Sequence, residues 1–129
     1  MENQCLSKKF FHMAHSILEN HSELELSEAN IREVKDLMNN SKKSFIKSTA
    51  EIETIAVDLM AEMWDVSPDS DKIYKLLDKK YTLKKESVKA LMGAFLSLKK
   101  MLSKEQLCKL YGFCKAHAHA EKKDGSCKR

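Results

Sequence analysis

The chain has 129 residues, of which 43% are hydrophobic and 33% are charged, and its formal net charge is +4. It contains 3 glycines and 1 proline, which is too few for the many tight turns of a β-sandwich. No stretch reaches the roughly 18 uncharged apolar residues of a membrane-spanning helix, so we expect no membrane insertion. The composition favours one all-α domain, which we place at residues 1–120, with a disordered polar tail at 121–129.

The basic residues are nearly all lysines. Arginine, which recognises phosphates and bases through its planar fork, occurs only at Arg32 and Arg129. The surplus positive charge is spread along the chain rather than gathered in one run. We therefore predict a solvated lysine surface and no nucleic-acid partner.

Apolar residues that recur at helical spacing predict a first helix at about 4–20 and, after a break at 20–25, a second from Ser27 to about Trp64. The first stripe consists of Leu6, Phe10, Met13 and Ile17, and the second of Ile31, Val34, Met38, Phe45, Ile52, Ile55, Leu59 and Met63. The polar interval at 39–44 interrupts the second stripe. It marks either a weak spot in this helix or an exposed face.

A turn is expected at 65–68, with Ser67 as the N-cap of a third helix and Pro68 at its first position. This helix is predicted to reach about Met101, and a last helix to run from Ser103 to about His119. The second helix would be roughly 55 Å long at 1.5 Å per residue. Two such helices in an antiparallel hairpin form a thin plank that buries little surface. We therefore predict a four-helix, hairpin-like plank that forms a two-fold homodimer.

Two copies of one short motif open helices in this scheme: Leu26-Ser27-x-x-Asn30 and Leu102-Ser103-x-x-Gln106. In the second copy Ser103 can cap the helix and Gln106 can reach back to the Ser103 amide, which makes a capping box. The first copy repeats this arrangement with the shorter Asn30. Each motif alone is typical of an ordinary helix start. Two copies, each at the start of a helix in one hairpin protein, are a more specific signal.

The pair resembles the two Leu-Thr-x-x-Gln motifs of the Spy/CpxP family, with Ser in place of both Thr residues and Asn in place of one Gln. The order of elements over about residues 10–118 is similar too. Related members include periplasmic heavy-metal sensors and zinc-resistance proteins. The resemblance implies a curved helical dimer in the bacterial periplasm, with its leader removed. Such a protein shields unfolding clients without ATP, or senses envelope stress or metal for a membrane sensor protein.

Methionines on the long helices suit a surface that binds variable clients, because their side chains are flexible and polarizable. The candidate client contacts are Met38, Met60, Met63 and Met92. The alternative is that these residues form core or dimer contacts. Abundant lysine would attract acidic segments of clients.

Two clusters of histidine and cysteine could bind Zn, Ni or Cu. In the first helix, helical spacing places Cys5, His12, His15 and Glu19 on the face opposite Phe10 and Ile17, so these groups are expected to be exposed. The second cluster consists of Cys108, Cys114, His117, His119 and Cys127. An intact helix separates His117 from His119 by about 200°, and no Cys-x-x-Cys pair occurs. A solvated polar face and reduced thiols are the alternatives. A disulfide from Cys5 to Cys108 or Cys114, or one between subunits, is geometrically possible.

No glycine-rich phosphate loop or nucleophile elbow occurs, so we expect no enzymatic activity and no required cofactor. Our first hypothesis is a periplasmic, ATP-independent chaperone or envelope-stress adaptor that binds unfolded or partly folded clients. The second is a periplasmic heavy-metal-binding or metal-sensing protein on the same scaffold. The third is a cytosolic helical adaptor that meets protein or nucleic acid through its lysines.

Overall fold

The structure, a computed structural model, describes residues 2–118, and within them the side chains of residues 5–113. This part of the chain contains four helices and no strand, which confirms the all-α class. The helices are α1 (Glu2–Glu19), α2 (Glu28–Met63), α3 (Ser70–Met101) and α4 (Lys104–Ala118). The tail predicted at 121–129 lies outside the described residues.

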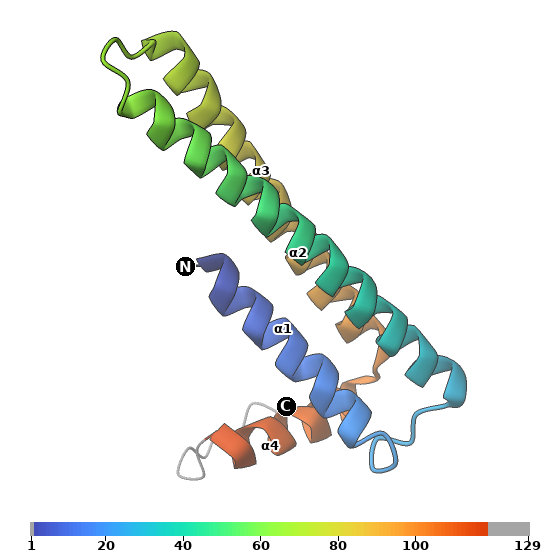
Figure 1. Cartoon of the computed structure of the whole chain (residues 1–129). Coiled ribbons are helices and arrows are strands. Elements are labelled where there is room, and N and C mark those ends of the chain that lie inside the picture. The colour runs from blue at the N-terminus through green and yellow to red at the C-terminus, as the bar shows by residue number, and fades with distance from the viewer. Residues whose placement is uncertain (1, 119–129) are drawn as a thin grey trace.

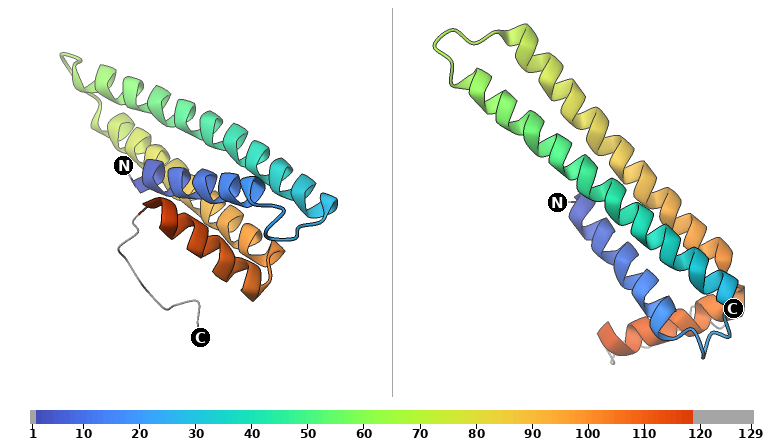
Figure 2. Two further views of the ribbon diagram at one scale, coloured as in Figure 1. Left: turned by 90° about the horizontal axis from the view of Figure 1, so that it is seen from below. Right: turned by 45° about the vertical axis from the view of Figure 1, so that its right-hand side comes forward.

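Helices α2 and α3 run side by side in opposite directions and form a long hairpin (Figure 1). Helix α1 lies along the lower half of this hairpin and contacts both of its helices, and α4 packs beside α1 (Figure 2). We call the covered part the base: α1, α4 and residues 20–45 and 87–103. The remainder, residues 46–86 of α2, α3 and their turn, extends beyond α1 and is called the arm.

The hydrophobic core lies in the base. Its buried members are Phe10, Met13, Ala14, Ile17, Leu24, Val34, Leu91, Ala94, Leu98, Leu102 and Leu110. The Phe10 ring meets the edges of its neighbours, with centroids 5.0 Å from Phe11 and 5.8 Å from Phe95. The contact between Phe10 and Phe95 joins α1 to α3, and aromatic pairs of this kind contribute more than their buried area alone.

Helix α2 continues without a break through the polar interval at 39–44. Most of the interval is exposed, and Ser41 is half-buried. The interval is therefore not a break in the helix, and it is only partly an exposed face, because Ser41 and Ser44 line a pocket between α2 and α3. Over the described residues, no helix combines the length and the apolar character needed to cross a bilayer.

The predicted cap at Ser67 is wrong. Asp69 is the N-cap of α3, and its Oδ1 accepts from the backbone N–H groups of Asp71 (3.1 Å) and Lys72 (3.4 Å). The N–H of Asp69 donates to Glu62 Oε2 at 3.0 Å, which fixes the cap against α2. A carboxylate that accepts from two amides caps a helix well, so α3 begins two residues after Pro68.

Candidate interaction surface

The second motif forms a complete capping box at the start of α4. The backbone N–H of Gln106 donates to Ser103 Oγ at 3.1 Å, and the Ser103 N–H donates to Gln106 Oε1 at 2.8 Å. Leu102 before the cap is buried and Leu107 packs against the same core, as a hydrophobic staple requires. This arrangement matches the one predicted for the second motif.

The first motif forms only half of this arrangement. The Asn30 N–H donates to Ser27 Oγ at 3.1 Å. Among the hydrogen bonds of the described residues, the Asn30 side chain makes none to the Ser27 amide, because it is one methylene shorter than Gln. Leu26 packs against the core, and Ile31 is half-buried.

The two motifs are joined through the loop that precedes α2. Gln106 Nε2 donates to the carbonyl oxygen of Leu24 at 2.6 Å, and Lys109 Nζ lies 3.4 Å from the carbonyl oxygen of Glu23. Leu24 is buried in the core, and the following Glu25 has a φ of 57°. The motif residues therefore hold the loop and the helix starts of the base together.

The arm presents a different surface, because its large apolar side chains are mostly exposed. Of the eleven exposed large hydrophobic residues in the described part of the chain, nine lie on the arm: Ile46, Val57, Met60, Met63, Trp64, Val66, Tyr74, Leu77 and Tyr81. Ile55, in contrast, is buried in the seam between α2 and α3. A cluster of exposed apolar groups of this kind is typical of an interaction surface.

Part of this surface continues the face that α1 covers in the base. Residues seven apart lie on nearly the same side of a helix, so Phe95, which contacts α1, is followed along α3 by Val88, Tyr81 and Tyr74. On α2, Phe45 packs against the core, and Met63 lies on its side of the helix. We call the arm portion of this face, which carries Ile52, Ala56, Met60, Met63, Tyr74, Leu77 and Tyr81, the open face. In Figure 1, α1 does not extend along this part of the hairpin.

A second, largely apolar stripe runs along the arm portion of α2 and was missed by the sequence analysis. Its positions alternate in steps of four and three: Ile46, Ala50, Glu53, Val57, Met60 and Trp64. All six residues are exposed. This spacing is that of a coiled-coil seam and could have been found by testing α2 for a second heptad pattern.

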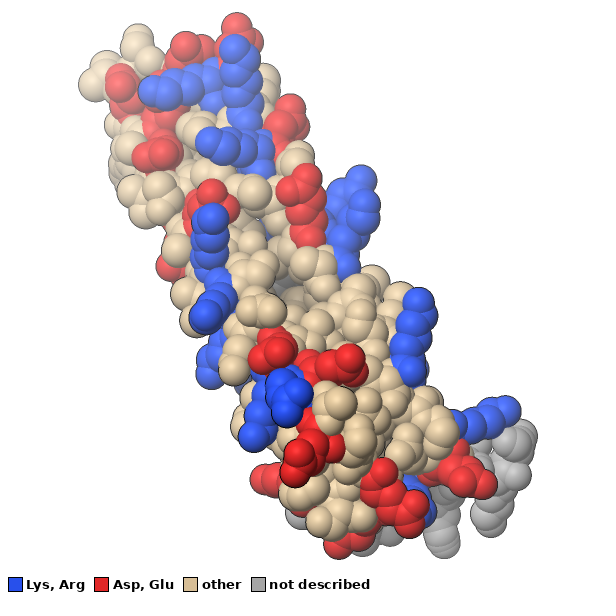
Figure 3. All heavy atoms as spheres, turned by 90° about the vertical axis from the view of Figure 1, so that its right-hand side faces the viewer, with Lys and Arg blue, Asp and Glu red and all other residues tan. Residues whose placement is uncertain are grey.

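The two helices of the arm differ in charge. Between residues 70 and 86, α3 carries six lysines and three acidic residues, whereas α2 between 46 and 63 carries one lysine and four acidic residues. Lys80 and Lys84 place their Nζ atoms 5.8 and 5.5 Å from the centre of the Tyr81 ring. Figure 3 shows one side of the molecule, on which acidic and basic side chains stand among uncharged atoms along the whole length.

The four methionines predicted to contact clients are not equivalent in the structure. Met60 and Met63 are exposed on the arm, and Met92 is exposed on α3 in the base. Met38 is half-buried and packs against the core, because it faces the same way as Phe45. Met38 therefore fits the alternative of a core contact.

The predicted metal ligands on α1 are exposed, as expected from their helical spacing: Cys5, His12, His15 and Glu19. Within the described residues, no three His, Cys, Asp or Glu side chains gather in a way that could hold an ion. Cys5 and Cys108 are not joined in a disulfide. The side chains of Cys114 and His117 and the whole of His119 and Cys127 lie outside the described part, so the second cluster stays a prediction.

No protein-family model, curated protein or solved structure matches this chain.

Proposed function

We propose that the protein is an ATP-independent chaperone whose arm binds apolar segments exposed by partly folded proteins. The observation that carries this proposal is the exposure of apolar side chains on the arm, in continuation of the face that α1 covers in the base. Helix α1 is itself an amphipathic segment held on this face. The open face offers a similar apolar surface to an amphipathic segment of another protein.

The side chains of the open face suit variable partners. Met60 and Met63 can adapt their shape to different clients, and Tyr74 and Tyr81 offer rigid apolar area together with a hydroxyl group. The lysines of α3 would draw in segments that carry acidic residues and would raise the rate of encounter. Binding of this kind needs no nucleotide.

The proposal includes the two features that the resemblance to the Spy/CpxP family implies, a periplasmic location and a homodimer. An envelope-stress adaptor would use the same surface for one membrane sensor protein. Chaperone activity requires binding of many unrelated clients, whereas an adaptor would select one. The two roles are thus distinguished by the number of client sequences that bind.

Light scattering by a client that aggregates on unfolding tests the proposal in the absence of nucleotide. We expect near-stoichiometric amounts of the protein to suppress aggregation. Tyr81→Ser, on the open face, should weaken client binding about fivefold, as loss of an aromatic anchor commonly does. Leu96→Ser is the matched control, because Leu96 is 60% exposed and Tyr81 54% exposed, but Leu96 lies on the base.

Trp64 provides a second measurement, since it is the single tryptophan of the chain and is 79% exposed near the tip of the arm. A tryptophan-free client that covers the arm should shift its fluorescence to shorter wavelength. The proposal is wrong if aggregation is unaffected, or if Tyr81→Ser and Leu96→Ser weaken client binding equally.

A further inference from the structure

A small pocket opens between α2 and α3 at the top of the base. It has a volume of about 160 Å³ and is lined by Asn40, Ser41, Ser44, Phe45, Ser87, Ala90 and Leu91. Leu91 is buried and Phe45 packs against the core, whereas Asn40, Ser44 and Ala90 are exposed. The pocket therefore has an apolar floor toward the core and a polar mouth on the surface.

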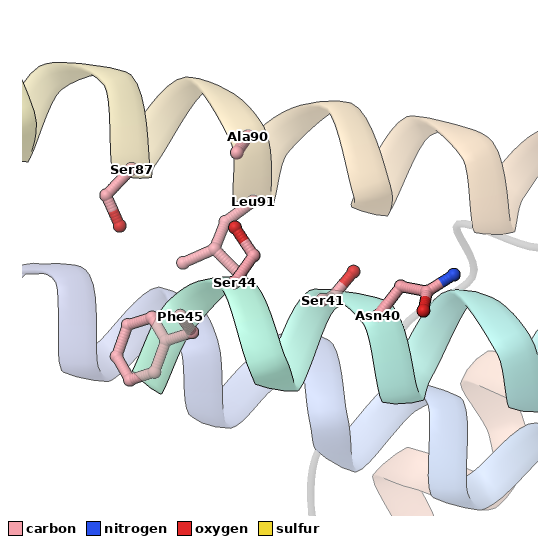
Figure 4. Close-up of a pocket in the computed structure, with 7 residues that line it drawn as sticks. All are labelled: Asn40, Ser41, Ser44, Phe45, Ser87, Ala90 and Leu91. Atoms are coloured by element: carbon pink, nitrogen blue, oxygen red, sulfur yellow. The ribbon is translucent and has the colours of Figure 1, made fainter. Parts of the chain in front are cut away.

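The pocket exists because small residues occupy positions in the seam where large apolar ones would pack. Ser41 and Ser44 on α2 point toward α3, Ser87 on α3 points toward α2, and Ala90 adds little volume (Figure 4). Leucine at such positions would fill the seam and stabilise the hairpin. The small residues therefore keep a pocket open at positions where larger apolar residues would stabilise the folded hairpin.

The hydroxyl of Ser87 is the feature that indicates a ligand. Ser87 is 94% buried, being 6% exposed, and its side chain points from α3 toward α2 (Figure 4). In the described part of the chain this hydroxyl has no hydrogen-bond partner, although helical serines commonly bond to the carbonyl four residues earlier. Every fully buried side-chain oxygen in that part has a hydrogen-bond partner. The Ser87 oxygen has none, so it is not fully buried, and a ligand can contact it through the pocket.

We infer that this pocket binds a small uncharged molecule with an aromatic ring and one hydrogen-bonding group, of about the size of phenol. None of the seven lining residues is charged, which disfavours an ion. Phe45 and Leu91 suit the ring, and Ser87 with Ser41 and Ser44 can donate to or accept from the polar group. The volume is similar to that of an apolar cavity of about 150 Å³ that holds benzene.

Titration with phenol, followed by amide NMR shifts of the whole chain, tests this inference. We expect saturable shifts at 40–45 and 87–91 with low-millimolar affinity, which is reasonable for a ligand of so few atoms. Benzene should bind about fivefold more weakly, because it leaves the hydroxyls without a partner.

Ser87→Leu should abolish phenol binding and raise the urea concentration at the unfolding midpoint, since leucine fills the pocket. Ser44→Leu fills the same space from α2 and serves if the first variant does not fold. Ser97→Leu, at an exposed site on α3, is the matched control and should leave phenol binding unchanged. The inference fails if phenol shifts amides along the apolar arm instead of the pocket, or if both pocket variants bind phenol as the unaltered protein does.

Discussion

The base and the arm are built from the same two helices but use apolar residues in opposite ways. In the base, α1 covers the hairpin, α4 packs beside α1, and eleven apolar side chains form one buried core. On the arm two helices stand alone, and a two-helix layer can bury only the stripe along its seam. Apolar residues beyond that stripe are therefore exposed on the arm, where they are available to a partner. The buried core and the surface proposed to bind clients therefore lie in different parts of the hairpin.

Leu98 and Leu96 test this division most directly, because they are two residues apart on α3. Leu98 is fully buried and Leu96 is 60% exposed. Leu98→Ala should lower the free energy of unfolding by about 2–5 kcal/mol, since it leaves a cavity in the core. Leu96→Ala should change it by less than about 0.5 kcal/mol. Urea unfolding followed by circular dichroism measures both, and equal losses would contradict the division.

The two motifs give the next largest expected effect. Gln106→Ala removes the hydrogen bond to the Ser103 amide and the hydrogen bond to the Leu24 carbonyl. We therefore expect the free energy of unfolding to fall by about 1–2 kcal/mol. Asn30→Ala leaves the backbone bond to Ser27 Oγ in place and should cost under about 0.5 kcal/mol.

Equal losses in these two variants would show that the motifs are equivalent, as their sequences suggest, and that the hydrogen bonds of Gln106 add nothing. Thermal unfolding of the two variants side by side provides the measurement. Gln106→Glu is a useful third variant, because it keeps an acceptor for the Ser103 amide but removes the donor to Leu24.

Apolar periodicity is enough to predict the four helices, because a long amphipathic stripe such as that of α2 leaves few alternatives. The contact between Gln106 and Leu24 could not be predicted, since it joins residues 82 positions apart. The cap at Asp69 depends on Glu62 of the preceding helix, and local sequence favoured Ser67. The open face was missed because the exposure of Tyr74 and Tyr81 depends on whether another helix covers α3, which the local sequence does not determine.

At the tip of the arm, Glu62 should matter more than its charged partner. Its side chain is 12% exposed, accepts from the Asp69 amide and lies 3.2 Å from Lys72 Nζ. Glu62→Ala leaves that amide without its acceptor and should cost about 1 kcal/mol. Lys72 is 63% exposed, so Lys72→Ala should cost no more than about 0.5 kcal/mol. If the free energy of unfolding falls equally in both variants, the ion pair between Glu62 and Lys72 stabilises the tip, and the hydrogen bond from the Asp69 amide does not.

The smallest expected effect concerns Val57, which is 67% exposed and belongs to the second apolar stripe of α2. If the folded chain leaves this stripe in water, Val57→Ser should change the free energy of unfolding by less than about 0.5 kcal/mol. If a second copy covers the stripe, as the predicted homodimer allows, the loss should be larger and the unfolding midpoint should rise with protein concentration. Unfolding at two concentrations separates these outcomes. A large loss that does not depend on concentration would mean that the stripe packs within one chain, and the contrast between base and arm would then be wrong.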